Sequence, residues 1–295
     1  MTRWLLYGAN GHTGELIARE AHKRGLEPAL AGRNLTAVKP LAEGLGLEYR
    51  IFDLRDADAQ LSGIEVVLHC AGPFSVTAAP MIDACLRTGT HYLDITGEMD
   101  VFAYAREVDD RARIDGRITA TPLGGRTARI DFGNGTKPAL AFPAADLHSA
   151  RHSTAIPNIE VYLPMPFLLI FGVRIGRRLA GLLARPGVRA AAHKLIDKTV
   201  KGPDANQRAT RTAHVWGETT DAAGRRLTAR ITTANPYRLT IDGALTAVTD
   251  LLAAPAPRPG AHTPATLFGA DLITRLPGSG PLTITTSHET EGTTQ

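Results

Sequence analysis

Short apolar runs alternate with helical patterns along the first 116 residues of the chain. Runs of strand length predict five strands, over Trp4–Tyr7, Glu27–Ala31, Glu48–Phe52, Glu65–Ala71 and His91–Ile95. Apolar positions at helical spacing predict the intervening helices, over Thr13–Arg24, Leu35–Leu45, Ala78–Arg87 and Asp100–Arg113. Such alternation is typical of a parallel sheet with right-handed crossovers. We therefore expect an α/β, Rossmann-like, doubly wound domain over residues 1–116.

The pattern changes after Gly116, where proline, glycine and threonine become frequent. Two alternating runs, His214–Thr220 and Arg225–Thr233, flank a turn-forming Asp-Ala-Ala-Gly and predict a β-hairpin. A helical pattern follows over Thr240–Leu252. We predict a second, α+β substrate domain over residues 117–276, whose helix near 240–252 can pack back on the first domain, and a C-terminal tail over residues 277–295.

An apolar run over Leu163–Val173 leads into a segment with an arginine-rich face. The segment is predicted to form a helix with one apolar face and one basic face. The apolar face consists of Ile175, Leu179, Leu182 and Leu183. The basic face consists of Arg174, Arg177, Arg178 and Arg185. The run is too short to cross a bilayer unless the arginines entered it. Two interpretations stay open for residues 161–193: packing on the substrate domain, or contact with an anionic membrane or a long acyl chain.

Composition narrows the class of protein. The chain has 295 residues, a formal net charge of +4 and 43% apolar residues, as expected of a folded globular protein. The mild basic excess suits an anionic cofactor or membrane surface, but without basic runs interleaved with aromatics it does not indicate nucleic acid binding.

The two cysteines, Cys70 and Cys85, lie in apolar segments, and Met1-Thr2-Arg3 leads directly into the first strand without a secretory signal. We expect a cytoplasmic protein, with membrane association as the open alternative.

A glycine-rich turn connects the first predicted strand to the first predicted helix. It reads Tyr7-Gly8-Ala9-Asn10-Gly11-His12-Thr13-Gly14. In this context Gly8 allows a sharp turn, Gly11 lets a pyrophosphate approach the backbone amides, and Gly14 allows close packing of helix on strand. Asn10 and Thr13 can supply further donors, with Ala9 and His12 completing the turn. The alternative is a glycine-rich turn that binds no ligand.

Cofactor choice is predicted from the end of the second strand, which reads Ala31-Gly32-Arg33-Asn34. NAD-binding folds place an acidic residue there, which accepts hydrogen bonds from the ribose hydroxyl groups. Arg33 cannot accept them, but its planar guanidinium suits the 2′-phosphate of NADP. We therefore predict NADP(H) as cofactor, with a solvated surface arginine as the alternative.

Four segments together resemble the saccharopine dehydrogenase-like family, and more narrowly its branch of trans-acting enoyl reductases. They read YGANGHTG (7–14), LAGRN (30–34), VVLHCAGPF (66–74) and ACLRTGTHYLDITGE (84–98). The resemblance implies an NADP-binding Rossmann domain followed by an α+β domain that covers the nicotinamide end. It implies that the glycines hold the pyrophosphate, that Arg33 and Asn34 lie at the adenosine phosphate, and that Asp53 lies near the adenine. It further implies cofactor contacts at the ends of the fourth and fifth strands, from Ala71, Gly72, Pro73, Thr96 and Gly97.

The chain departs from the family pattern after the helix that is predicted to end near Arg113. Family members continue with a sixth strand and a PGVGFD-type loop, whereas this chain runs from Arg111–Gly116 directly into Arg117–Ala120. The sheet then either ends in an exposed edge or uses Arg117–Thr121 to cover it. The substrate pocket also loses one wall.

No side chain is singled out as catalytic by its sequence context. None of the six tyrosines has a lysine four residues later, so short-chain dehydrogenase chemistry is not indicated. Glu98 and Tyr162 are the candidates for catalysis, each with a structural role as the alternative. His148 and His152 have the i, i+4 spacing that could place two metal ligands on one helical face, but no glutamate base lies between them and the surrounding sequence does not favour a helix. Ser75 and Ser153 lack the glycine elbow of a hydrolase, so we expect no metal and no hydrolase.

The leading hypothesis is an NADP(H)-dependent oxidoreductase that reduces a C=C or C=O bond of a hydrophobic or acyl substrate. A second enzymatic hypothesis is an amine-forming or amine-cleaving reductase closer to saccharopine metabolism. A third hypothesis is an NADP(H)-binding sensor or membrane-peripheral protein without turnover.

Overall fold

The structure, a computed structural model, describes residues 3–107, 126–142, 144, 146–156, 158–178, 211–255 and 259–288. The chain divides into two compact units. Unit 1 comprises Met1–Arg117, Ala144–Ala155 and Tyr237–Leu276, and unit 2 comprises Ile118–Pro143, Ile156–Pro236 and Pro277–Gln295.

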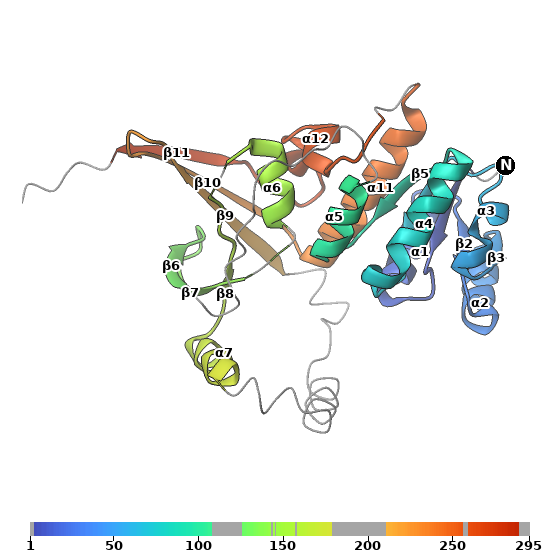
Figure 1. The fold of residues 1–295 in the computed structure, drawn as a ribbon, viewed down its shortest axis with the longest axis horizontal. Coiled ribbons are helices and arrows are strands. Elements are labelled where there is room, and N and C mark those ends of the chain that lie inside the picture. Colours follow the sequence, from blue (N-terminus) through green and yellow to red (C-terminus); the bar gives the residue numbers. More distant parts are fainter. Residues whose placement is uncertain are drawn as a thin grey trace, which may run out of the picture. The chain divides into compact units, whose positions relative to one another are not determined.

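Unit 1 is built around a five-stranded sheet with the strand order β3-β2-β1-β4-β5 (Figure 1). Its strands are β1 (Trp4–Tyr7), β2 (Ala29–Gly32), β3 (Tyr49–Ile51), β4 (Val66–His69) and β5 (His91–Asp94). β1, β2 and β4 are buried along their whole length, as expected of apolar strands covered on both faces. All neighbouring pairs are parallel, so the carboxyl ends of the strands meet at one edge. The predicted Rossmann-like α/β fold is confirmed.

Helices cover both faces of this sheet (Figure 1). One face packs through side chains such as Leu6 and Leu68 against α1 (His12–Lys23), α2 (Leu35–Leu45) and α11 (Pro236–Ala253). The other face packs through side chains such as Tyr7 and Val67 against α3 (Ala57–Gln60) and α4 (Phe74–Thr88). The remaining helices of unit 1 are η1 (Leu54–Asp56), α5 (Met99–Glu107), α6 (Asp146–Thr154), α12 (Pro264–Phe268) and α13 (Leu272–Arg275).

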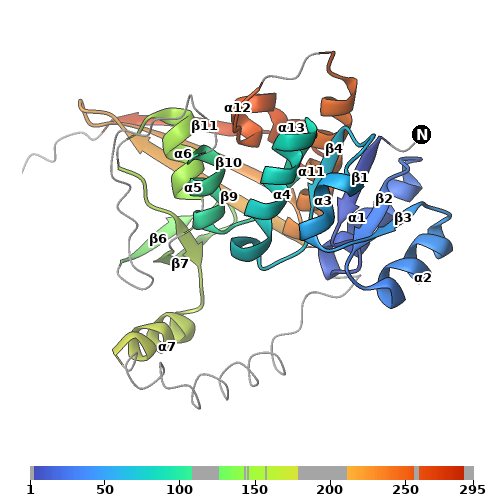
Figure 2. The same cartoon turned by 45° about the vertical axis from the view of Figure 1, so that its right-hand side comes forward.

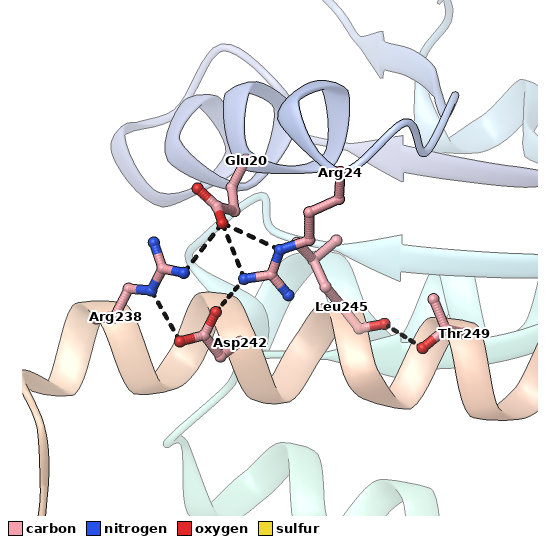
Figure 3. Close-up of polar contacts among 6 residues, drawn as sticks. All are labelled: Glu20, Arg24, Arg238, Asp242, Leu245 and Thr249. Carbon is pink, nitrogen blue, oxygen red and sulfur yellow. Dashed lines mark hydrogen bonds and ion pairs between the residues drawn. The ribbon is translucent and has the colours of Figure 1, made fainter. Parts of the chain in front are cut away.

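A charged network joins α11 to α1 (Figure 3). Asp242 of α11 is fully buried and accepts hydrogen bonds from Arg24 of α1 and from Arg238, the latter at 2.8 Å. Glu20 of α1 accepts hydrogen bonds from the same two guanidinium groups, at 2.9 Å from Arg24 and 3.0 Å from Arg238. Burial raises the pKa of Glu20, but the hydrogen bonds and charges of the two arginines outweigh burial and hold that pKa below its usual range. The four side chains thus fix a helix from near the C-terminus onto the first helix of the chain.

The units interleave along the chain, and the helix expected near 240–252 packs back on the first unit as α11, as the sequence pattern allowed. Residues 144–155 and 237–276 belong to unit 1, although the predicted substrate domain spans 117–276 without a break. The apolar face of α11 explains its place, because Leu245 and Val248 complete the core on one side of the unit 1 sheet. The predicted edge cover, Arg117–Thr121, lies outside the described residues.

Unit 2 contains two antiparallel three-stranded sheets. One has the order β6-β7-β8 and consists of β6 (Thr127–Asp131), β7 (Thr136–Ala141) and β8 (Tyr162–Pro164). The other has the order β11-β10-β9 and consists of β9 (Thr212–Thr220), β10 (Arg225–Ala234) and β11 (Thr283–His288) (Figure 2). The predicted hairpin is confirmed as β9 and β10, and the Asp221 carboxylate accepts hydrogen bonds from two amides of its turn. Trp216 packs against Ile130 and Phe132, which joins the two sheets.

The chain end departs from the expected tail over 277–295. Thr283–His288 forms β11, which pairs antiparallel with β10 from Arg225↔His288 to Arg230↔Thr283. Threonine-rich segments have a high propensity for strands, and an open edge on β10 offers such a segment a complete set of hydrogen bonds. The polarity that suggested a tail is instead that of a strand exposed along its length.

Candidate cofactor site

The turn between β1 and α1 depends on two of its three glycines for its shape. Gly8 has φ +82°, and a Cβ atom there would lie 2.6 Å from the backbone nitrogen of Ala71. A Cβ atom on Gly14 would lie 2.2 Å from the carbonyl oxygen of Gly8, closer than any side chain can approach. These distances agree with the predicted sharp turn at Gly8 and close helix packing at Gly14. At Gly11 the backbone is extended (φ −75°) and a Cβ atom would be merely tight, 3.3 Å from the Gly8 oxygen.

The N-terminus of α1 presents amides without acceptors. Gly11 is the N-cap and supplies no side chain, and its own amide donates to the Gly8 carbonyl at 3.0 Å. Among the described residues, no acceptor contacts the amides of His12, Thr13 and Gly14. In unit 1, Asn34 caps α2 and Thr263 caps α12 with their side chains, whereas the short helices α3 and α13 have no side-chain cap, like α1. An open N-terminus with aligned peptide dipoles is the arrangement that binds phosphate groups.

Arg33 follows β2 directly, beside this turn. Its side chain is exposed and makes no hydrogen bond or ion pair with another described residue. The space above the strand end is tight, because a Cβ atom on Gly32 would lie 3.0 Å from the Asn10 side-chain oxygen. The Asn10 side chain of the glycine turn therefore lies against Gly32, the residue that precedes Arg33. The end of β2, which carries the exposed Arg33, thus adjoins the glycine turn that leads into α1.

Two other predicted cofactor residues already have partners within the protein. The Asn34 side chain accepts a hydrogen bond from the Thr36 amide at 3.0 Å and so caps α2. The Asp53 carboxylate caps η1 and pairs with Arg55 at 2.9 Å. Hydrogen bonds from Arg55, with a smaller contribution from the charge of Arg33, hold the pKa of Asp53 below its usual range. Asp53 is therefore an anion that lies near the guanidinium of Arg33.

The ends of β4 and β5 bring the remaining predicted residues to the same edge of the sheet. Ala71 approaches Gly8 closely, as the short distance to a Cβ atom there shows, and the exposed Gly72 and Pro73 follow. After β5, the Thr96 amide donates to Asp94 and the Thr96 hydroxyl accepts from the Glu98 amide. Gly97 is exposed in this turn. The edge holds the glycine turn, Arg33, residues 71–73 and residues 96–97, all from unit 1.

Glu98 occupies the start of α4. Its two carboxylate oxygens accept hydrogen bonds from the backbone amides of Phe74 at 2.8 Å and of Ser75 at 2.7 Å. These bonds, with that from Phe74 the strongest, hold the pKa of Glu98 below its usual range. At neutral pH the side chain is an anion that is fully engaged with backbone donors, which is unfavourable for a general acid.

Tyr162 lies in β8 of unit 2, where its hydroxyl donates to Glu160 at 2.7 Å. Partial burial, together with the Glu160 carboxylate, raises the pKa of Tyr162.

The side chains of His148 and His152 lie outside those that the structure describes, although the surrounding segment is helical as α6. The described residues include no group of three or more potential metal ligands.

Two features of the site are not apparent from the sequence pattern. Tyr237, at the start of α11, lies edge-on to His12 of the glycine turn, with ring centroids 5.5 Å apart. His69 is fully buried at the end of β4, and its Nε2 lies 3.0 Å from Thr77 Oγ1. Because the Thr77 hydroxyl donates to the Ala71 carbonyl at 2.6 Å, the His69 ring supports the loop over residues 71–73 through Thr77. Burial lowers the pKa of His69 to about 4, so the ring is neutral at physiological pH.

Both cysteines are free and chemically inert in this setting. Burial, and for Cys70 also the charge of Asp94, raises the pKa of Cys70 and Cys85 to about 12. The thiols stay protonated at neutral pH, which excludes them as nucleophiles.

Residues 4–120 match the family described as the saccharopine dehydrogenase NADP binding domain. This N-terminal part of the chain thus matches a saccharopine dehydrogenase-type NADP-binding domain. The resemblance seen in the sequence motifs is confirmed, as is NADP as the cofactor of the domain.

Curated relatives carry related names. The chain is 30% identical over 183 residues to an Arabidopsis thaliana protein named "Probable mitochondrial saccharopine dehydrogenase-like oxidoreductase"; the alignment covers 55% of this chain and 38% of that protein. It is 37% identical over 105 residues to the trans-acting enoyl reductase of Mycobacterium leprae, covering 32% of this chain and 25% of that protein. The matched part thus spans about two-fifths of the one relative and a quarter of the other.

Among solved structures, the apo form of saccharopine dehydrogenase (L-Glu forming) from Saccharomyces cerevisiae matches with a TM-score of 0.61 at 10% identity. The match covers 97% of this chain and 100% of that one, and at this identity it establishes the fold alone.

Proposed function

We propose that the chain is an NADP(H)-dependent oxidoreductase that reduces a C=C or C=O bond of a hydrophobic or acyl substrate. The observation that carries this proposal is the open N-terminus of α1 at the same sheet edge as the exposed Arg33. A diphosphate requires several convergent N–H donors, and the phosphate of the adenosine ribose requires a separate cation. The site offers both, and the match to the NADP-binding domain family supports the same assignment.

Each part of the site then has a definite task. The amides of His12, Thr13 and Gly14 hold the diphosphate, and the bare backbone at Gly11 lets the phosphate groups come close. Arg33 pairs with the 2′-phosphate, while Asn10 and Ala9 line the turn between them. Residues 71–73 and 96–97 border the nicotinamide end, where His69 and Thr77 support the first of these loops. When bound, the reduced cofactor supplies the hydride. The protein therefore has to bind the cofactor and the substrate, orient them toward each other and exclude water.

The substrate class is supported by the relatives rather than by identified contacts. One curated relative is named a trans-acting enoyl reductase, and reduction of an enoyl group is reduction of a C=C bond. A relative with a saccharopine dehydrogenase-like name keeps amine chemistry as a second reaction to test. We place the protein in the cytoplasm, because its two cysteines are free thiols.

The alternative is an NADP(H)-binding sensor or membrane-peripheral protein without turnover. It is supported by the state of the two catalytic candidates, since Glu98 is engaged by backbone donors and the Tyr162 hydroxyl by Glu160.

Calorimetric titration with NADPH and NADH, followed by a turnover screen, tests the proposal. We expect NADPH to bind and to be oxidised steadily in the presence of at least one member of a panel of enoyl thioesters, ketones and imines. Binding of NADPH without oxidation by any panel member would favour the sensor. No binding of either nucleotide would overturn both assignments.

A further inference from the structure

An apolar stripe runs along one face of α7 (Phe167–Arg178) in unit 2. Phe167, Leu168, Phe171 and Ile175 are 70%, 81%, 56% and 41% exposed. Their spacing along the helix places all four side chains on one side, within an arc of roughly 100°. Large apolar side chains that gather in this way on a surface usually mark a contact with a partner or a membrane.

The opposite face of α7 is attached to unit 2. Ile170 is 3% exposed and Val173 is half-buried, so these two side chains form the packed side, whereas Leu169, outside the stripe, is 58% exposed. Before the helix, the Met165 amide donates to the Pro138 carbonyl of β7 at 3.0 Å. Near its end, Arg174 Nη2 donates to Thr127 Oγ1 of β6 at 3.3 Å. The open stripe therefore belongs to a helix with a fixed orientation on its own unit.

The charge around the stripe is positive. Arg174 is exposed and contacts Thr127 of β6, and Arg129 lies on the same face of β6 as Thr127. The acidic Asp131 on that face is paired with Arg230 at 3.6 Å. The sequence continues this bias, since residues 174–201 contain eight lysines and arginines and a single acidic residue, Asp197. Aromatic and aliphatic side chains next to a basic segment are the features by which amphipathic helices rest on anionic membranes.

We infer that α7 docks this protein on an anionic lipid surface, with the stripe of Phe167, Leu168, Phe171 and Ile175 entering the interface and the exposed Arg174 contacting the headgroups. A second copy of the chain fits less well, because a two-fold contact through the same patch would bring the Arg174 side chains of the two copies toward one another. No described helix is long and apolar enough to cross a membrane. The inference is independent of the proposed oxidoreductase function, because unit 2 holds the stripe and unit 1 holds the cofactor site.

Co-sedimentation of the full chain with vesicles tests this inference. We expect binding to vesicles that contain phosphatidylglycerol, at least tenfold weaker binding to pure phosphatidylcholine vesicles, and weaker binding as salt increases. The double variant Leu168→Ser/Phe171→Ser should lose at least tenfold in partitioning to the anionic vesicles. Leu86→Ser is the matched control, because Leu86 is a 61% exposed leucine on α4 of unit 1. That control should bind like the wild type.

Circular dichroism and calorimetric NADPH titration of each variant separate a docking defect from a folding or cofactor defect. Two results would overturn the inference: no binding of the wild type to anionic vesicles, or equal binding by the wild type and the double variant. Self-association of the wild type that the double variant abolishes would also overturn it, since the stripe would then contact a second copy.

Discussion

Glu98 accepts a hydrogen bond from the backbone amide of Phe74 at 2.8 Å and thereby caps a helix that begins 24 residues earlier in the chain. α1 and α4 both start at the carboxyl edge of the sheet, so each could present open amides to an anion. In α4 a carboxylate of the protein itself takes that place, whereas in α1 no described residue does. Of these two helices, only α1 therefore has an open N-terminus. It lies at the sheet edge that also carries Arg33.

Replacement of the Glu98 carboxylate tests its capping role. We expect Glu98→Gln to lower the free energy of unfolding by about 1 kcal/mol at neutral pH, as the loss of a helix cap does. The folded protein holds the pKa of Glu98 below its usual range, so the stabilisation is complete above the unfolded pKa of about 4.3 and is lost as the pH falls through the folded value. Urea unfolding of both proteins at neutral pH and at about pH 3 should show the difference shrinking in acid.

Glu43→Gln is the control for this measurement, because Glu43 is an exposed residue of α2 that pairs with Lys39 on the surface. Its effect should stay below about 0.5 kcal/mol. A Glu98→Gln protein of unchanged stability that had lost NADPH turnover would instead make Glu98 a catalytic residue.

The requirement for glycine at position 14 can be tested directly. In Gly14→Ala the new methyl group would lie 2.2 Å from the Gly8 carbonyl oxygen, so α1 has to move away from β1. We expect a loss of about 1–3 kcal/mol of stability and a weaker affinity for NADPH, because the amides move with the helix. Gly44→Ala in α2 is the control, since no atom lies within 4 Å of its Cβ position, and it should be neutral or stabilising by up to about 1 kcal/mol. Equal stability of Gly14→Ala and wild type would contradict the packing role.

Sequence reasoning succeeded where local chemistry determines structure. The five strands and the glycine turn follow from runs of apolar residues and from the conformational freedom of Gly8, both of which can be judged within a few residues. It failed where a contact joins distant segments. The contact of Tyr237 with His12 and the pairing of β11 with β10 leave no periodic signal, because each depends on a partner far along the chain. For the same reason Glu98 was a catalytic candidate in the sequence and is a helix cap in the structure.

The buried carboxylate of α11 should contribute strongly to the stability of unit 1. In Asp242→Asn, Arg24 and Arg238 keep only Glu20 as a common anion, so two nearby positive charges are left partly uncompensated (Figure 3). We expect a loss of about 2–4 kcal/mol, somewhat below that of a wholly buried pair because both guanidinium groups are partly exposed. Glu15→Gln, which removes the exposed pair with Arg19 on the same α1, should cost no more than about 0.5 kcal/mol. Urea unfolding measures both, and similar small effects would show that the network does not hold α11 in place.

Cofactor selectivity should depend on Arg33. We expect the wild type to bind NADPH at least about tenfold more tightly than NADH, which corresponds to about 1.4 kcal/mol. Arg33→Asp should reverse or abolish this preference, because a carboxylate repels the 2′-phosphate and accepts hydrogen bonds from the ribose hydroxyl of NADH. Arg33→Lys should retain part of the preference, since it keeps the charge and loses the planar fork. Arg55→Gln is the matched control, because Arg55 is 88% exposed near the same strand end and pairs with Asp53. It should alter the affinities for the two nucleotides equally, if at all. Calorimetric titrations that gave the wild type equal affinity for NADPH and NADH would remove Arg33 from the site, even if the open amides of α1 still held the diphosphate.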